Sequence, residues 1–413
     1  MEKGKLILAQ DQYYSLDCYE TQLNNNVLVV GTSGAGKTRS IVSPNLLQAT
    51  GSYIVTDPKG NLYGKYGDYL RKNGYEVKKL DFTNPKDSAH YNFFRYIKDQ
   101  QDFLKIAHAL MNQRDMSNFR GDFFWDDASE LLLQAMIAYM IEGEKEEDRN
   151  FHHMMKLLET CKPGTLSYEG NSLEMKFNRI YAYNSQSFAV RQYNKFKIGA
   201  DKTLKSILIA LYAKLGKYDS PELNAMMKTD DIDLESIGKK KTALFVVVSD
   251  TDRSLDGLVN IFFTQAMNVL CNYADRECED NTLPVPVRFI MDDFATNCAI
   301  VDFQKMISSI RSRGISVMLM IQAEAQLSAM YGPDAKTIIG NCDTYVYLGG
   351  NDVDTAESIA KRCNVLPEKI LYMPVGTNWI FRRGQRPING TNFVLEDYEK
   401  IFNRREEDWN LGK

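Results

Sequence analysis

A short apolar run that leads directly into a glycine-rich turn constrains this chain more than any other feature. The run is Val27 to Val30, and "GTSGAGKT" follows it with the spacing G-x-x-x-x-G-K-[ST]. Glycines at this spacing let backbone N–H groups curl around a phosphate, and the start of the next helix adds a favourable dipole. The stretch predicts a strand, a phosphate-binding loop and a helix. The alternative is a glycine turn with an accidental lysine.

The residues of this loop have expected roles in binding a nucleoside triphosphate. The lysine would reach the β- and γ-phosphate oxygens, and the threonine hydroxyl that follows it would ligate Mg²⁺. The predicted nucleotide-binding residues are Gly31, Thr32, Ser33, Gly34, Ala35, Gly36, Lys37 and Thr38.

A second apolar run ends in two adjacent carboxylates. It is "VRFIMDD", 287–293, which has the composition of a buried strand up to Asp292 and Asp293. A phosphate loop needs a strand that brings an acid to the magnesium. We therefore expect Asp292 to hold the metal and Asp293 to orient or deprotonate the attacking water. The alternative is that the two aspartates cap a following helix.

Further apolar runs of strand length are spread along the chain, and helix-length segments separate them. They lie at 53–57, 75–82, 243–250, 315–322 and 344–350. Near-continuous apolar strands that alternate with helices predict a mainly parallel sheet covered on both faces. The expected fold class is α/β, with the architecture of phosphate-loop nucleotide-binding proteins. Asp57, the last residue of the first of these runs, and Lys59 just beyond it would contact nucleotide or shape a turn.

The pattern changes between residues 98 and 235, where no convincing strand occurs. The segments 126–141 and 202–215 have helical spacing, and the first opens with a capping pattern from Asp127 to Glu130. We expect an all-helical domain at 98–235, inserted into a nucleotide-binding domain formed by 1–97 and 236–413.

Composition excludes several other classes of protein. The formal net charge is −4, which is not typical of a protein that grips nucleic acid over its whole surface. No apolar run approaches the roughly 20 residues that span a bilayer, and the N-terminus lacks a signal-peptide pattern. Seven cysteines without a C-x-x-C pair and four histidines indicate neither a disulfide framework nor a zinc site. We expect a soluble chain in the reducing cytosol.

One basic segment nevertheless lies within the helical region, from Arg191 to Lys217. It contains seven basic residues and the single acid Asp201: Arg191, Lys195, Lys197, Lys202, Lys205, Lys214 and Lys217. Phosphate contacts from such a segment would give sequence-independent, salt-sensitive DNA binding. Tyr193 and Phe196 would stack on bases or belong to a core face. The alternative is an exposed helix made soluble by lysine.

Four blocks, taken in order, resemble the type IV secretion system coupling proteins, the ATPases of bacterial conjugation. The blocks are "GTSGAGKTRSIVSPNLL", "VTDPKGNLYGKYGDYLRKNGYEVKKLDF", "RFIMDDFATN" and "IQAEAQLSAMYGPDAKTIIGNCDTYVYLGGNDVDTAESIAKR". The resemblance runs from about Leu6 to about Asn392. It is more specific than the phosphate loop, which many ATPases share.

The resemblance implies a RecA-like nucleotide-binding domain with an all-helical domain, assembled as a homo-hexamer at the cytoplasmic face of the bacterial inner membrane. ATP and Mg²⁺ would be the cofactors. The partners would be single-stranded DNA, a relaxase and components of the secretion channel. Gln322 matches the family's sensor of the γ-phosphate, and Arg311 matches an arginine finger supplied across a subunit interface. The alternatives are a hydrogen-bonded residue at a strand end and a solvated helix charge.

Two features depart from the family. Asp293 stands where the family usually has Glu, which is one methylene longer, so hydrolysis could be slow. The membrane segments that normally precede the phosphate loop are absent, so the chain is expected to be a truncated form or a relative brought to the membrane by a partner. Two other functions stay open: a nucleotide-binding docking module with little hydrolysis, and a secretion ATPase that moves protein or double-stranded DNA.

Overall fold

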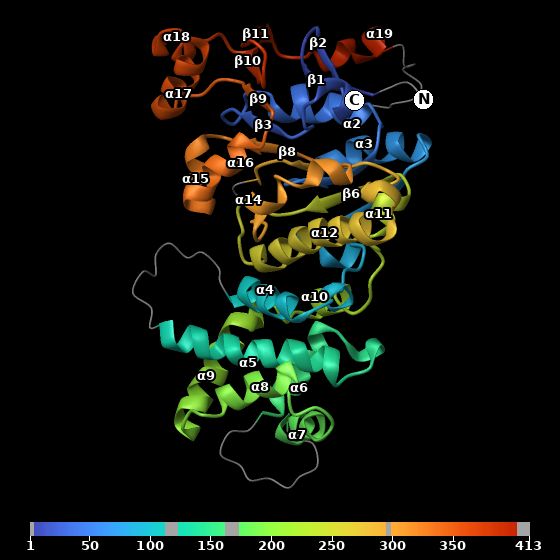
Figure 1. Cartoon of the computed structure of the whole chain (residues 1–413), viewed down its shortest axis with the longest axis vertical. Helices are drawn as coiled ribbons and strands as arrows, with labels where there is room; N and C mark the ends of the chain where they lie inside the picture. The colour runs from blue at the N-terminus through green and yellow to red at the C-terminus, as the bar shows by residue number, and fades with distance from the viewer. Residues whose placement is uncertain (1–3, 112–122, 162–172, 295–298, 403–413) are drawn as a thin grey trace. The chain divides into compact units, whose positions relative to one another are not determined.

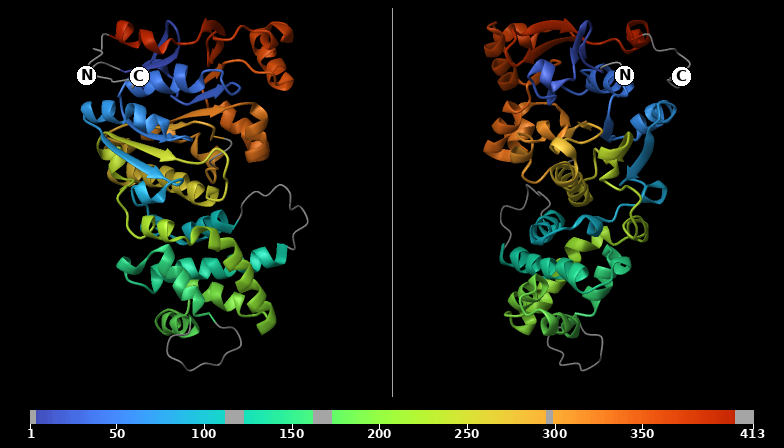
Figure 2. Two further views of the ribbon diagram at one scale, coloured as in Figure 1. Left: turned by 180° about the vertical axis from the view of Figure 1, so that it is seen from behind. Right: turned by 45° about the vertical axis from the view of Figure 1, so that its right-hand side comes forward.

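The computed structural model describes residues 4–111, 123–161, 173–294 and 299–402 of the chain (Figures 1 and 2). Two compact units divide the chain. The first comprises residues 1–83, 233–251 and 266–413, and the second comprises 84–232 and 252–265. The breaks at 83/84 and 232/233 lie near the expected boundaries at 97/98 and 235/236. The division into a domain of 1–97 and 236–413 with an all-helical domain inserted at 98–235 stays a prediction.

Among the described residues of the first unit, nine strands form one sheet in the order β11-β10-β9-β3-β8-β7-β4-β6-β5. All neighbours from β9 to β5 pair in parallel, and β10 pairs antiparallel with β9 and β11. A mainly parallel α/β sheet is confirmed. The strands are β3 (Val27–Val30), β4 (Ser52–Thr56), β5 (Glu76–Asp81), β6 (Thr242–Val247), β7 (Val287–Met291), β8 (Ile315–Ile321), β9 (Thr344–Tyr347), β10 (Thr377–Arg382) and β11 (Ile388–Thr391).

The central strands are apolar along their length because both of their faces are covered. Every residue of β3, β4, β6, β7 and β8 is buried. A strand buried on both faces shows a continuous apolar run in place of alternation, which is why these segments are recognisable in the sequence.

One face of the sheet packs against the hairpin of β1 (Lys5–Ala9) and β2 (Gln12–Ser15), the helix that follows the phosphate loop, and α3 (Asn61–Lys72). Leu6, Leu46 and Leu70 from these elements share a core with Val29 and Ile290 of the sheet. The β1–β2 hairpin and the β10–β11 pair are not among the predicted strands. They are short, and their pairing brings together residues whose burial depends on the rest of the fold.

The remaining helices of the first unit lie between or after the strands (Figure 1). They are α1 (Cys18–Thr21), the π-helical turn η1 (Lys37–Val42), α2 (Ser43–Leu47), α11 (Ser236–Lys239), α14 (Phe303–Met306), α15 (Glu324–Tyr331), α16 (Ala335–Gly340), α17 (Val353–Cys363), α18 (Pro367–Leu371) and α19 (Tyr398–Phe402), with 3₁₀ turns at η6 (Glu279–Asn281), η7 (Ile310–Arg313), η8 (Gly332–Asp334) and η9 (Leu395–Asp397). α12 (Asp256–Glu277) begins in the second unit and ends in the first.

The described part of the second unit is helical and contains no strand. Its helices are α4 (Gln100–Met111), α5 (Phe123–Glu142), α6 (Phe151–Glu159), α7 (Leu173–Tyr183), α8 (Phe188–Phe196), α9 (Asp201–Leu215) and α10 (Pro221–Met226), with 3₁₀ turns η2 (Pro85–Asp87), η3 (Phe93–Tyr96), η4 (Glu146–Asp148) and η5 (Gly216–Tyr218). In the described ranges, no helix has both the length and the apolar character needed to span a bilayer.

The second unit corrects one expectation about a helix start. The capping pattern from Asp127 to Glu130 predicts a start near Asp127, but α5 is already helical at Phe123. Asp127 therefore lies in the second turn of the helix, where its side chain cannot act as the N-cap. The aromatic residues that precede it extend the helix in the N-terminal direction.

Candidate nucleotide-binding site

The loop that follows β3 has a backbone conformation that requires glycine. Gly34 and Gly36 have φ of 80° and 94°, in the left-handed region, which costs other residues about 1–2 kcal/mol. A Cβ on Gly36 would also lie 3.0 Å from Ser40 Oγ, and a Cβ on Gly31 would lie 2.9 Å from the Leu348 Cβ. The predicted strand, loop and helix are present, and the helix begins as η1 at Lys37.

Lys37 is buried beneath the loop and is held by backbone carbonyls. Its Nζ donates to the carbonyl oxygens of Gly31 at 2.7 Å and Thr32 at 3.2 Å. Burial lowers the pKa of Lys37, while the carboxylates of Asp293 and Asp292 oppose this shift. A cation that is largely removed from water and lies near two acids is suited to meet a further anionic group, such as a phosphate, on the loop side.

Thr38 and Asp292 join the loop to the acidic strand. The Thr38 hydroxyl donates to Asp292 Oδ2 at 2.6 Å, although the two residues are 254 positions apart. Thr56 at the end of β4 donates to the Asp292 carbonyl oxygen at 2.8 Å, which anchors the acid on its other side. Burial raises the pKa of Asp292, and the hydrogen bond from Thr38 opposes the shift. A hydroxyl and a carboxylate on facing elements are oxygen ligands of the kind that Mg²⁺ prefers.

Asp293 directly follows this acid and has a strained backbone. Its φ is 50°, and its N–H donates to Asp292 Oδ1 at 3.1 Å. The side chain is only partly buried. The hydrogen bond from the Asp293 N–H orients the Asp292 carboxylate. The positive φ of Asp293 turns the chain away from the direction of β7. The residues that would form a helix capped by these aspartates lie mostly outside the described part of the chain.

Gln322 lies at the same edge of the sheet as the loop and the acids. It follows β8, the strand that lies between β3 and β7. Its backbone N–H donates to Gln326 Oε1 at 2.7 Å, and the residue is exposed. The strand order therefore places Gln322 between the phosphate loop and Asp292, with a side chain open to a ligand.

Arg311 lies at the other end of β8. It belongs to η7, which precedes the strand, and its Nη2 donates to the Cys18 carbonyl oxygen at 2.9 Å. Because the strands are parallel, this edge is opposite to the edge that carries Lys37 and Asp292. Arg311 is exposed and is not part of the site in its own chain.

Asp57 also ends a strand at the site edge, but its contacts favour a structural role. The side chain is 2% exposed and accepts the Tyr63 N–H at 2.8 Å, in the first turn of α3. Burial raises the pKa of Asp57, and backbone N–H groups led by that of Tyr63 oppose the shift. Lys59, two residues on, is exposed. Asp57 thus holds the start of α3.

Asn392 is a site residue that the sequence patterns do not indicate. Its Nδ2 donates to the Ala35 carbonyl oxygen in the phosphate loop at 3.2 Å, and Asn378 of β10 donates to its Oδ1 at 3.0 Å. The contact depends on the antiparallel pairing of β10 with β9, which has no local signature. The only sequence signal is the polar "NG" and "TN" that interrupt the segment 388–393.

The basic segment in the second unit presents only part of its charge to solvent. Lys197 pairs with Glu174, and Lys214 pairs with Asp126. Tyr193 is buried and stacks on Phe177 with a ring separation of 4.1 Å, and Phe196 is buried as well. The two aromatic residues therefore belong to the core of the unit and are not free to stack on bases. The cations that stay exposed include Lys195, Lys202 and Lys205.

Comparison with known families matches this chain nearly end to end. The family model described as type IV secretory system conjugative DNA transfer matches residues 1–391. The chain belongs to this family. One similar curated protein is the type IV secretion system-coupling protein VirD4 of Bartonella henselae, which is 19% identical over 93% of this chain and 60% of its own length. The chain thus spans about 60% of the length of that relative.

Solved structures share the fold. A bacterial conjugative coupling protein, TrwBdeltaN70 in its unbound form, has a TM-score of 0.66 at 17% identity, with 95% of this chain and 89% of that chain covered. The plasmid coupling protein TrwB in complex with ADP and Mg²⁺ has a TM-score of 0.64 at 18% identity, with coverage of 95% and 90%. These similarities confirm the RecA-like α/β fold of the family.

Proposed function

We propose that this chain is an ATP-hydrolysing coupling protein, which recruits DNA with its relaxase and moves it as a single strand to a type IV secretion channel. The observation that carries the proposal is the contact between Thr38 and Asp292 at 2.6 Å, with the buried Lys37 beside it. A hydroxyl, a carboxylate and an ammonium group meet at the end of a glycine-rich loop, which is the set of groups that phosphoryl transfer requires.

The loop from Gly31 to Thr38 would hold the phosphates of ATP. Its backbone N–H groups and Lys37 would contact the phosphate oxygens, as in other phosphate-loop proteins. Thr38 and Asp292 would hold Mg²⁺, which supplies neutralisation of phosphate charge when bound. The related protein TrwB has been solved with ADP and Mg²⁺, which supports this choice of cofactors.

Two further residues would act on the attacking water and on the γ-phosphate. Asp293 follows the metal-holding acid and would orient or deprotonate the water. Gln322 is exposed between the two site strands and would respond to the γ-phosphate. Arg311 lies at the opposite edge of the sheet, so it would reach a γ-phosphate only in a neighbouring copy. This placement supports a homo-hexamer in which each site is completed by the next subunit.

DNA contact would come from the second unit. Lys195, Lys202 and Lys205 are exposed and would contact phosphates without reading sequence. A ring would repeat this charge in every subunit. The partners would be a relaxase and components of the secretion channel, and the place of action would be the cytoplasmic face of the bacterial inner membrane.

The test is ATP hydrolysis by the purified chain, with and without single-stranded DNA. We expect turnover to rise with DNA and with protein concentration, and to vanish in Lys37→Ala. Asp293→Glu restores the longer carboxylate and is expected to keep or increase turnover. Double-stranded DNA and protein substrates serve as comparison activators. Stronger stimulation by either one would favour a secretion ATPase that moves duplex DNA or protein.

A second candidate function is favoured by Asp293 itself. A carboxylate that is one methylene shorter than glutamate reaches less far towards a water, so the chain would bind nucleotide and dock cargo with little hydrolysis. This candidate predicts ATP binding that is lost in Lys37→Ala, with no turnover under any of the conditions above. Measurable turnover in the wild-type chain would eliminate it.

A further inference from the structure

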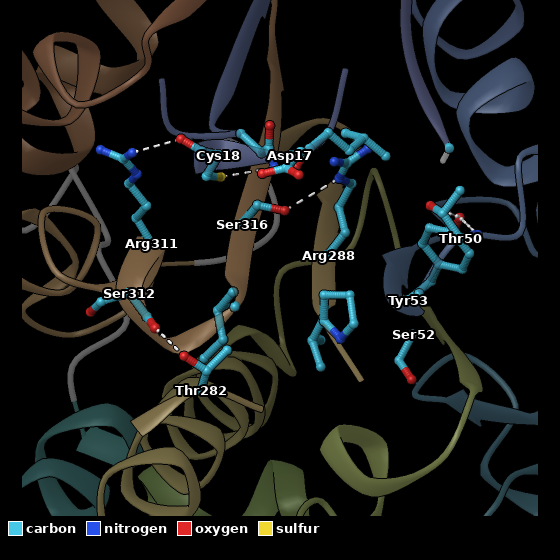
Figure 3. Close-up of a pocket in the computed structure, with 18 of the residues that line it drawn as sticks. Asp17, Cys18, Thr50, Ser52, Tyr53, Thr282, Arg288, Arg311, Ser312 and Ser316 are labelled. Atoms are coloured by element: carbon cyan, nitrogen blue, oxygen red, sulfur yellow. Dashed lines mark hydrogen bonds between the residues drawn. The ribbon is translucent and has the colours of Figure 1, made fainter. Parts of the chain in front are cut away.

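A cavity of about 590 Å³ lies at the edge of the sheet opposite to the phosphate loop (Figure 3). Its floor is formed by the first residues of β4, β7 and β8, and its rim by the segment around Cys18 and by η7. All the lining residues belong to the first unit. None of the roles proposed for nucleotide binding uses this cavity, although Arg311 lies on its rim.

The floor of the cavity carries an arginine within an otherwise apolar strand. Strand register places Arg288 of β7 directly between Tyr53 of β4 and Ser316 of β8, so the three side chains share one face of the sheet. Arg288 is 8% exposed. Its Nε donates to Ser316 Oγ at 3.3 Å, and Figure 3 shows the side chain rising from β7 towards the rim.

The guanidinium of Arg288 has no anionic partner within the part of the chain that the structure describes. No described carboxylate oxygen comes within 4.0 Å of its nitrogens. A guanidinium has five N–H donors and stays charged under all ordinary conditions. Removing such a cation from water without a counter-charge costs several kcal/mol. An arginine at this position is therefore explained most simply if an anion enters the cavity.

The rest of the lining suits an anion attached to an apolar body. Arg311 at the rim supplies a second guanidinium, and Asp17 is the acidic residue of the described lining. The Asp17 carboxylate accepts the backbone N–H groups of Tyr19 and Glu20, which directs it to the start of α1. Apolar surface comes from Leu16, Tyr53, Pro286, Val287 and Ile315.

We propose that this cavity binds a small organic oxyanion, a phosphate or carboxylate group on an apolar or aromatic body, with Arg288 as its main contact and Arg311 at its rim. A volume of about 590 Å³ is within the range of small-molecule sites. The proposal does not depend on ATP hydrolysis or on any role of Arg311 in a neighbouring subunit.

Cys18 provides a reporter inside the cavity, because its thiol lies in the lining and accepts a hydrogen bond from Asn25 Nδ2 at 3.2 Å. The experiment compares alkylation of Cys18 by the anion iodoacetate and by neutral iodoacetamide, resolved by peptide mass spectrometry, with Cys278 as the internal reference. The same Cys18 thiolate attacks the CH₂–I carbon of both reagents and displaces iodide, so the ratio of the two rates cancels any change in the pKa of the thiol.

We expect the ratio of the iodoacetate to the iodoacetamide alkylation rate at Cys18 to fall about fivefold in Arg288→Met. A change of about this size is expected when one unit charge close to the thiol is removed in a solvent-accessible environment. Arg288→Lys keeps the positive charge, so its rate ratio should stay close to that of wild type. Arg276→Met, an exposed arginine on α12, should leave it unchanged. A ratio at Cys18 that is the same in wild type, Arg288→Lys and Arg288→Met would overturn the proposal.

Protection of Cys18 tests binding in the wild-type chain and needs no variant to fold. Phenyl phosphate or benzoate at millimolar concentration should slow alkylation of Cys18 by iodoacetamide, while neutral benzyl alcohol should not. Stronger protection by phenyl phosphate than by benzoate assigns a phosphate ligand, and the reverse assigns a carboxylate. The proposal fails if neither anion protects, or if benzyl alcohol protects equally well.

Discussion

Replacing Thr38 by valine removes the hydroxyl that connects the phosphate loop to the acidic strand while keeping the shape of the side chain. In the absence of nucleotide, the substitution leaves Asp292 Oδ2 without its donor at 2.6 Å. Asp292 is 7% exposed, so water cannot fully replace the lost bond. Hydrogen bonds to charged groups contribute about 1.5–3 kcal/mol, and we predict a loss of about 2 kcal/mol in the free energy of unfolding.

A double-mutant cycle isolates the part of this loss that belongs to the Thr38–Asp292 pair. In an Asp292→Asn background the hydroxyl faces a neutral amide, so Thr38→Val should cost only about 1 kcal/mol. The predicted coupling is therefore about 1 kcal/mol. Thr391→Val, at an exposed position in β11, is the matched control and should change stability by less than about 0.5 kcal/mol.

The assay is urea unfolding followed by the fluorescence of Trp379, a buried residue of β10 that reports on the first unit. Trp125 and Trp409 are replaced by phenylalanine, so that Trp379 is the only tryptophan whose fluorescence is measured. A loss below about 0.5 kcal/mol in Thr38→Val, or effects of the two substitutions that simply add, would refute a stabilising bond between Thr38 and Asp292.

Three further predictions test the electrostatics, the loop and the DNA contact. Burial raises the pKa of Asp292 above its ordinary 3.8, so the folded form holds that proton to higher pH than the unfolded chain. The free energy of unfolding of wild type should therefore fall relative to that of Asp292→Asn as pH rises through the raised pKa. A difference between the two free energies that does not change with pH, measured by urea unfolding, would contradict this. Gly36→Ala, at φ 94°, should cost about 1–2 kcal/mol and abolish ATP binding in a calorimetric titration, whereas Gly64→Ala in the exposed face of α3 should gain about 0.5–1 kcal/mol. Equal effects of the two substitutions would refute the strain argument. Replacing Lys195, Lys202 and Lys205 by glutamine should reduce the salt slope of single-strand binding by about 2, at about 0.7 per phosphate contact, and an unchanged slope in fluorescence anisotropy would place the DNA contact elsewhere.

The parts of the site that a local pattern specifies could be predicted from the sequence. The phosphate loop is a contiguous motif, and "VRFIMDD" shows a buried strand that ends in acids. Parallel pairing then brings Thr38 and Asp292 together across 254 positions, because carboxyl ends of parallel strands share one edge. The same rule places Gln322 at the site edge and Arg311 at the opposite edge.

Features that depend on register or on antiparallel pairing were not predictable in the same way. Asn392 reaches the phosphate loop only because β10 pairs with β9 and β11. Arg288 appears in the sequence as one polar residue in an apolar run, and its place between Tyr53 and Ser316 follows from two strand registers. Tyr193 and Phe196 were compatible with base stacking or with a core; both are buried, and Tyr193 stacks on Phe177, so they belong to the core.

The most direct test of the central claim mixes two inactive variants. Lys37 and Arg311 lie at opposite edges of the sheet, so under the proposed function Arg311 would act in the site of a neighbouring subunit. Lys37→Ala and Arg311→Ala should each lack DNA-stimulated ATP hydrolysis, and an equal mixture should recover about a quarter of the wild-type rate, because about one interface in four would pair an intact lysine with an intact arginine. If wild type hydrolyses ATP with single-stranded DNA while the mixture stays as inactive as its components, the shared-site motor is contradicted.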